Sequence, residues 1–73
     1  MVRQVILYPD TVTIQMSDGQ LCVLQRPQVG AWAGAAGGCS HDLQTQVQTP
    51  VAVRKVLSSG AGSAVLINGI AYG

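Results

Sequence analysis

The chain contains 73 residues, enough for one small domain, since folding units usually have about 100–150 residues. Its 4 basic and 3 acidic residues leave a net charge of +1, and a hydrophobic content of 48% excludes a disordered tail. The apolar stretches are about half as long as the ~20 residues of a membrane helix, so no membrane span is predicted. Residues 1–73 are therefore expected to form one small β domain.

Three strands are predicted in the first third of the chain, at residues 2–8, 11–16 and 20–26. The first range is rich in β-branched side chains, and the other two alternate between two faces, as strands of a half-buried sheet do. Asp18 and Gly19 form an Asp-Gly pair, which favours a tight turn between the second and third strands. These segments predict an antiparallel meander.

Residues 27–42 are rich in glycine and alanine around a single tryptophan, Trp32. We interpret this range as a loop, because each glycine costs a helix roughly 1 kcal/mol relative to alanine. A short helical turn at residues 31–36 is the weaker alternative. A loop of this length is uncommon in so small a domain unless it is anchored or functional.

The last part of the chain predicts further strands at residues 43–48, 51–57, 64–67 and 70–72. Asn68 and Gly69 join the last two in a tight β-hairpin, and no apolar period of 3.6 residues dominates. The sequence therefore predicts an all-β fold, a small barrel or sandwich of six to seven short antiparallel strands with a Gly/Ala-rich loop.

Cys22 and Cys39 are the two cysteines, and they enclose a segment of ordinary disulfide size. A disulfide would contribute about 3 kcal/mol and would anchor the Gly/Ala-rich loop to a strand, so we expect one. Two reduced, partly buried thiols are the alternative. With His41 the cysteines offer three metal ligands, whereas zinc sites generally use four with short paired spacings, and no metal site is expected.

Residues 39–42 read Cys-Ser-His-Asp, which are side chains that hydrolases use. A nucleophile, a base and an orienting group have to converge in space, and adjacency in the sequence does not provide this. We favour a turn in which Ser40 or Asp42 makes a local hydrogen bond. The glycine-rich runs lack the strand, helix and lysine of a phosphate loop. We therefore predict no catalytic residues, no cofactor and no enzyme activity.

Nucleic acid is not expected as a partner, because the chain has four basic and three aromatic residues in all. Low charge and a small core favour a homo-oligomer or a protein partner instead. Trp32 is the candidate binding residue, because a lone tryptophan among small residues either covers the core or forms an exposed contact point.

Residues 10–41 resemble small uncharacterised bacterial exported proteins. The likeness is carried by a Ser-Asp-Gly-x-x-Cys pattern that ends at Cys22, a Trp-x-Gly pattern that ends at Gly34, and a Gly-Cys pair that ends at Cys39. The resemblance implies a paired Cys22–Cys39 and a location in the envelope. No signal peptide is recognisable at the N-terminus, so the chain is either the mature part of an exported protein or a cytoplasmic protein.

The expected function is that of a non-enzymatic, disulfide-pinned binding or assembly module of the bacterial envelope, with the Trp32 loop as its contact surface. The alternative is a small cytoplasmic homo-oligomeric adaptor or inhibitor from a mobile or accessory gene. In that case, copies of the chain would pair through apolar strand edges, at residues 2–8 or 64–72.

Overall fold

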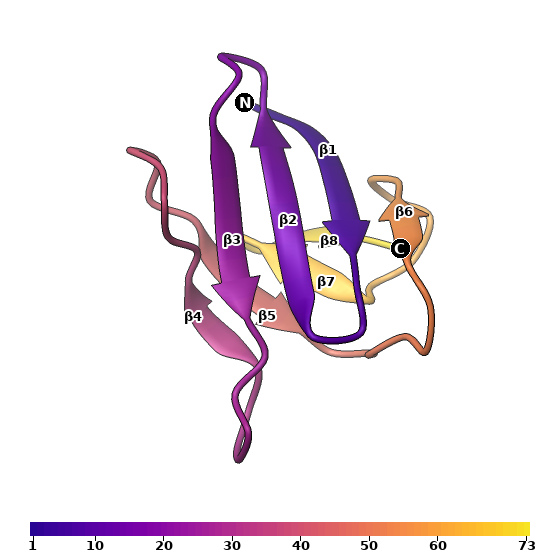
Figure 1. Cartoon of the computed structure of the whole chain (residues 1–73). Coiled ribbons are helices and arrows are strands. Elements are labelled where there is room, and N and C mark those ends of the chain that lie inside the picture. Colours follow the sequence, from indigo (N-terminus) through magenta and orange to yellow (C-terminus); the bar gives the residue numbers. More distant parts are fainter.

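Eight strands form the fold, and the computed structural model describes all 73 residues (Figure 1). The strands are β1 (Val2–Leu7), β2 (Thr11–Met16), β3 (Leu21–Gln25), β4 (Ala33–Ala35), β5 (Gln44–Val47), β6 (Lys55–Leu57), β7 (Val65–Ile67) and β8 (Ile70–Tyr72). Sheet A has the order β3-β2-β1-β6 and sheet B the order β4-β5-β7-β8. The all-β prediction is confirmed as a small sandwich of two antiparallel sheets, and not as a closed barrel. The chain contains no helix long and apolar enough to cross a membrane.

Sheet A contains the meander predicted from the first third of the chain. In β2 the side chains of Val12, Ile14 and Met16 are buried, and the residues between them point to the other face. This alternation follows from the two-residue period of a strand. The pairing of β1 with β2 shifts by one residue at Arg3, which forms a β-bulge near the start of the chain.

Sheet B is completed by the predicted hairpin of β7 and β8. Ile67 pairs with Ile70 across a two-residue turn, in which Asn68 has a φ of 47° and Gly69 a φ of 80°. Positive φ at both turn residues is the geometry that matches the twist of the flanking strands, and asparagine and glycine tolerate it best. The Asn-Gly hairpin prediction is confirmed.

Two parts of the chain differ from the predicted strands. The range expected to be a loop, 27–42, contains the short strand β4, whose Ala33 and Ala35 pair with β5. Alanine and glycine give no strand signal of their own, so pairing with β5 forms this strand. Of the strand expected at 51–57, only the last three residues form one, β6. β6 pairs with the last three residues of β1.

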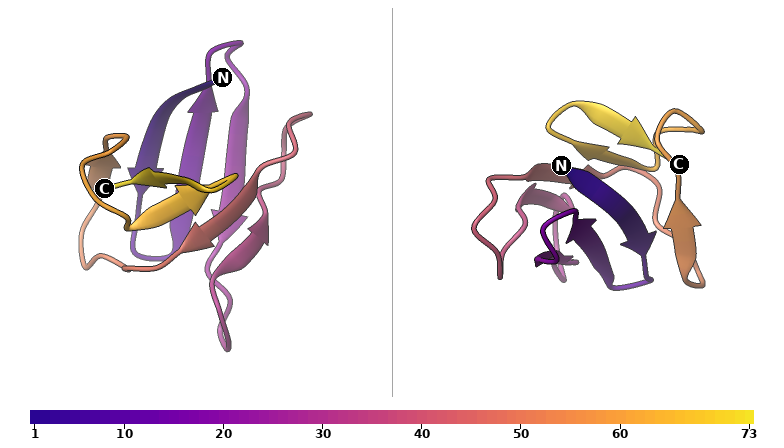
Figure 2. Two further views of the ribbon diagram at one scale, coloured as in Figure 1. Left: turned by 180° about the vertical axis from the view of Figure 1, so that it is seen from behind. Right: turned by 90° about the horizontal axis from the view of Figure 1, so that it is seen from above.

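The two sheets pack face to face with their strands crossing steeply (Figure 2). Between them lies a core of 13 buried side chains, contributed by both sheets and, outside the strands, by Trp32, Ala36 and Leu43. Isolated backbone pairs join the sheets at both sides, Val23 with Gly37 and Ser59 with Tyr72. These pairs satisfy backbone groups that a sandwich of this size otherwise leaves exposed.

The strand edges proposed for self-pairing are partly occupied. β1 is a central strand of sheet A, between β2 and β6. On the outer side of β8, Ser58 and Gly73 exchange two backbone hydrogen bonds, and Gly60 donates one to Ala71. β6 pairs only with Val5–Leu7 of β1, so residues 2–4 have no strand neighbour on that side. Pairing of copies through residues 2–8 or 64–72 stays a prediction, although these contacts leave little of either edge free.

Candidate functional site

The predicted disulfide joins Cys22 to Cys39, with 5.2 Å between their Cα atoms. Cys22 points into the core from β3, and Cys39 lies half-buried at the far end of the Gly/Ala-rich segment. The bond ties this segment to sheet A. Neither sulfur is available as a thiolate nucleophile or metal ligand while the bond is intact.

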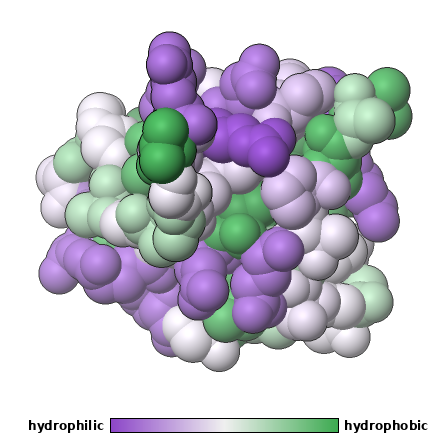
Figure 3. Space-filling view, turned by 90° about the horizontal axis from the view of Figure 1, so that it is seen from below, coloured by the Kyte–Doolittle hydropathy of each residue, from purple (hydrophilic) through white to green (hydrophobic).

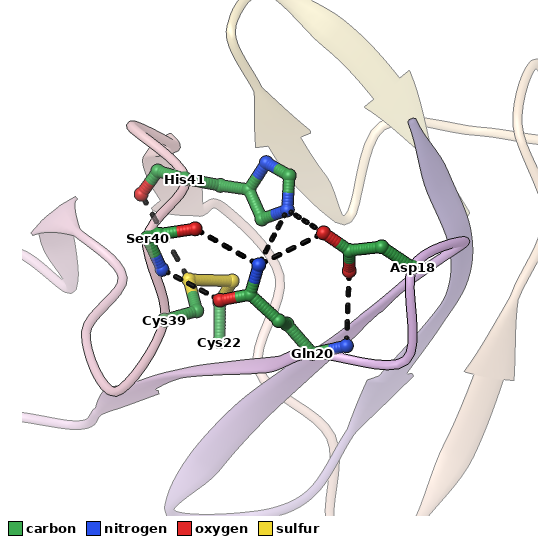
Figure 4. Close-up of polar contacts among 6 residues, drawn as sticks. All are labelled: Asp18, Gln20, Cys22, Cys39, Ser40 and His41. Carbon is green, nitrogen blue, oxygen red and sulfur yellow. Dashed lines mark hydrogen bonds and ion pairs between the residues drawn. A yellow bond between two sulfur atoms is a disulfide. The ribbon is translucent and has the colours of Figure 1, made fainter.

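A hydrogen-bonded network covers the disulfide at the turn between β2 and β3 (Figure 4). The backbone N–H of Gln20 donates to Asp18 Oδ1 at 3.0 Å, and its side-chain amide donates to Asp18 Oδ2 at 2.8 Å. Gln20 also reaches across the disulfide, where it accepts from the Ser40 backbone N–H and donates to Ser40 Oγ, both at 2.8 Å. One glutamine therefore links two segments that are distant in the sequence.

His41 completes the network through Nε2, which lies 2.8 Å from Asp18 Oδ2 and 3.3 Å from Gln20 Nε2. Both hydrogens of the Gln20 amide are already directed at Asp18 and Ser40, and an ionised carboxylate only accepts hydrogen bonds. The neutral imidazole therefore carries its hydrogen on Nε2 and donates it to Asp18. Nδ1, on the side of the ring away from Asp18 in Figure 4, is an acceptor without a hydrogen bond within the chain.

These donors hold the pKa of the Asp18 carboxyl group at about 2, below its ordinary value of 3.8. The backbone N–H of Gln20 contributes most, followed by the Gln20 side chain and then His41. Because the folded pKa is lowered, the carboxylate stabilises the fold above pH 3.8, and this contribution is lost as the pH falls towards about 2. We expect an NMR titration of the Asp18 carboxyl carbon to give a midpoint of about 2.

The variant Gln20→Ala tests which donors are responsible. It removes the side-chain amide and keeps the backbone N–H, so the Asp18 pKa should rise only part of the way to 3.8. A midpoint of 3.8 in the unaltered chain would show that the network does not form in solution.

The four consecutive residues Cys-Ser-His-Asp do not converge as a catalytic set. Cys39 is bonded to Cys22, and Ser40 Oγ accepts from Gln20. The carboxylate paired with His41 belongs to Asp18, whereas the adjacent Asp42 accepts from the Gln44 side chain at 3.2 Å. The sequence analysis did not identify Asp18 as a partner of His41, although the Cys22–Cys39 pairing could have indicated that their segments lie close together.

A groove of about 460 Å³ opens beside this network, between the two sheets. Its wall is mostly apolar and receives side chains from both sheets, among them Met16, Ile67 and Tyr72. His41 and Asp42 supply polar groups. The volume lies within the range of about 300–1,000 Å³ that is typical of small-molecule sites.

Trp32, the predicted binding residue, lies in the core with 5% of its surface exposed. Its Nε1–H donates to the Leu24 carbonyl at 3.3 Å, and the Arg26 guanidinium lies over the ring, 5.4 Å from its centroid. The sequence left two roles open for Trp32, and its position in the structure is that of a side chain that covers the core. The ring leaves almost no surface for a partner to contact.

The side of sheet A that is turned away from sheet B faces the viewer in Figure 1. We call it outer face A. Its central row follows the strand pairing through Val56, Ile6, Thr13 and Val23, and the next row contains Gln4, Gln15 and Leu21. Ile6 is 6% exposed but does not belong to the core between the sheets, so its neighbours on this face bury it. The sequence analysis singled out none of these residues.

Two of the three patterns that carry the resemblance to exported bacterial proteins, the Ser-Asp-Gly-x-x-Cys pattern and the Gly-Cys pair, meet at one place in the structure, whereas Trp32 lies in the core. The Ser-Asp-Gly turn provides Asp18, and the two cysteines of the pattern form the disulfide beneath it. The resemblance itself stays a prediction. No protein-family model, curated protein or solved structure matches this chain.

Proposed function

We propose that the chain is a non-enzymatic assembly module of the bacterial envelope, which associates with a second copy of itself through outer face A. The observation that carries this proposal is that the two rows of outer face A contain no charged residue and expose Leu21, Val23 and Val56. The disulfide supports a place in an oxidising compartment, because cytoplasmic thiols are normally kept reduced. The lack of a converging nucleophile and base supports a role without catalysis.

The distribution of charge favours a second copy as the partner. None of the seven charged residues belongs to these two rows: Arg3, Asp10, Asp18, Arg26, Asp42, Arg54 and Lys55. Arg3, at the β-bulge between Val2 and Gln4, lines a shallow hollow with Gln4 and Val56 and therefore lies at the edge of outer face A. Lys55 is on β6 next to Val56, which pairs with Ile6 on outer face A. Because neighbouring residues of a strand point to opposite faces, the Lys55 side chain leaves the sheet on the other side. The two rows of one copy can therefore meet those of another without like charges opposing each other, and Arg3 at the edge can keep its water.

The size of the surface sets the expected strength of association. Four strands of up to six residues span roughly 20 by 20 Å, or about 400 Å². A standard interface buries about 800 Å² per partner, so we expect weak association through a two-fold interface in the micromolar range or above. The lower end of the molecule is a poorer candidate, because its hydrophobic residues form separate spots between polar ones (Figure 3).

The variant Val23→Lys tests this proposal, with Val53→Lys as its matched control. Val23 is 39% exposed in the central row of outer face A, whereas Val53 is 74% exposed in the segment before β6. Both changes add one positive charge. Light scattering over a concentration series should show dimers for the unaltered chain and for Val53→Lys, and monomers for Val23→Lys.

Two results would contradict the proposal. One is a purely monomeric unaltered chain at concentrations up to the millimolar range. The other is equal association of the two lysine variants, which would place the contact elsewhere on the surface. Thermal unfolding of both variants should be measured alongside, because the interpretation requires that Val23→Lys remains folded.

A further inference from the structure

The groove between the sheets presents hydrogen-bond acceptors beside an apolar wall. His41 lines the groove, and its Nδ1 is an acceptor because Nε2 donates to Asp18. Asp42 also lines the groove, and one of its carboxylate oxygens accepts from Gln44 while no hydrogen bond within the chain reaches the other. Asn68 is the other polar residue of the wall, and its side-chain amide donates one of its two hydrogens to the Asp42 carbonyl.

The charge of this region is negative although the net charge of the chain is positive. Asp18 and Asp42 are two of the three acidic residues of the chain: Asp42 lines the groove, and Asp18 is paired with His41, which also lines it. None of the four basic side chains lines the groove. The Asp18 carboxylate keeps its charge down to acidic pH, because its pKa is about 2.

We propose that this groove is a binding site for a small apolar molecule that carries an ammonium group. The apolar part would lie against Ile67, Ile70 and Tyr72, and the ammonium group would donate to His41 Nδ1 and the Asp42 carboxylate. An ammonium group has three donors and no acceptor, which complements these acceptors. This site is separate from outer face A, and the inference does not depend on self-association.

Three ligands with the same tail and different heads test the site: hexylammonium, hexanol and hexanoate. NMR titrations should shift the methyl signals of Ile67 and Ile70 and the ring signals of His41. Exposed charge pairs contribute little, so we expect hexylammonium to bind about fivefold more tightly than hexanoate, with hexanol between them. Equal binding of the three ligands, or the absence of shifts at these residues, would overturn the proposal.

Asp42→Asn and Asp10→Asn form the matched pair of variants. Each removes one negative charge, but Asp10 lies at the turn between β1 and β2 and does not line the groove. The preference for hexylammonium should fall in Asp42→Asn and stay unchanged in Asp10→Asn. An equal fall in both variants would show that net charge, and not the groove, sets the preference.

A further variant, Ile70→Lys, keeps the test valid if Asp42→Asn is unfolded. Ile70 is 57% exposed, so the fold should tolerate a lysine at this position. The new ammonium group would compete for the acceptors of the groove, and hexylammonium should lose its binding. Unchanged binding of hexylammonium to folded Ile70→Lys would place its site elsewhere.

Discussion

Reduction of the Cys22–Cys39 disulfide is expected to lower the free energy of unfolding by about 3 kcal/mol, because the bond closes a loop with a sequence separation of 17. A chain of this length has a total stability of roughly 4–11 kcal/mol, so the loss is a large share of it. For a domain of this size the midpoint of thermal unfolding should fall by about 12–24 °C. Thermal unfolding followed by circular dichroism, with and without a reductant, measures this shift.

The double variant Cys22→Ala, Cys39→Ala is the control for the reductant. It should unfold at or below the midpoint of the reduced chain, because a buried cysteine is replaced by a smaller side chain. Its midpoint should not respond to the reductant. Equal midpoints for the oxidised and reduced chains would show that pairing between β4 and β5 and the packing of Trp32 hold the segment without the disulfide.

The disulfide also explains which parts of the fold could be predicted from the sequence. The strands of sheet A and the hairpin at Asn68 and Gly69 have local signals, which are alternation and turn residues. β4 has none, because Ala33 and Ala35 are in a strand only through pairing with β5, to which the anchored segment is bound. Local patterns report a preference of the segment itself, and they cannot report a partner that is distant in the sequence.

The candidate sites depend on such distant partners even more. The cysteine pair was correctly predicted, but the network around it joins Asp18 and Gln20 to Ser40 and His41 across about 20 residues. The groove forms only where the two sheets cross, because its wall receives side chains from both. Outer face A forms only when the four strands of sheet A are in their order. Val23 and Val56 are unremarkable in the sequence, and only the register places them in one row with Ile6.

Replacement of Trp32 by alanine is expected to lower the free energy of unfolding by about 3–5 kcal/mol, the usual range for a large buried aromatic residue. The side chain is 5% exposed, and its Nε1–H satisfies the Leu24 carbonyl. Trp32→Phe keeps most of the apolar contact and loses this hydrogen bond, so its cost should be about 1–2 kcal/mol. Chemical unfolding followed by circular dichroism compares the variants without depending on tryptophan fluorescence.

Val29→Ala is the matched control, because Val29 belongs to the same Gly/Ala-rich segment and is 89% exposed. Its effect should stay within about 0.5 kcal/mol, as is usual for surface positions. A stability of Trp32→Ala equal to that of Val29→Ala would contradict a core role for the ring and restore the contact-point interpretation. The expected order, with Trp32→Ala least stable and Trp32→Phe between it and Val29→Ala, would show that this tryptophan stabilises the sandwich by covering its core.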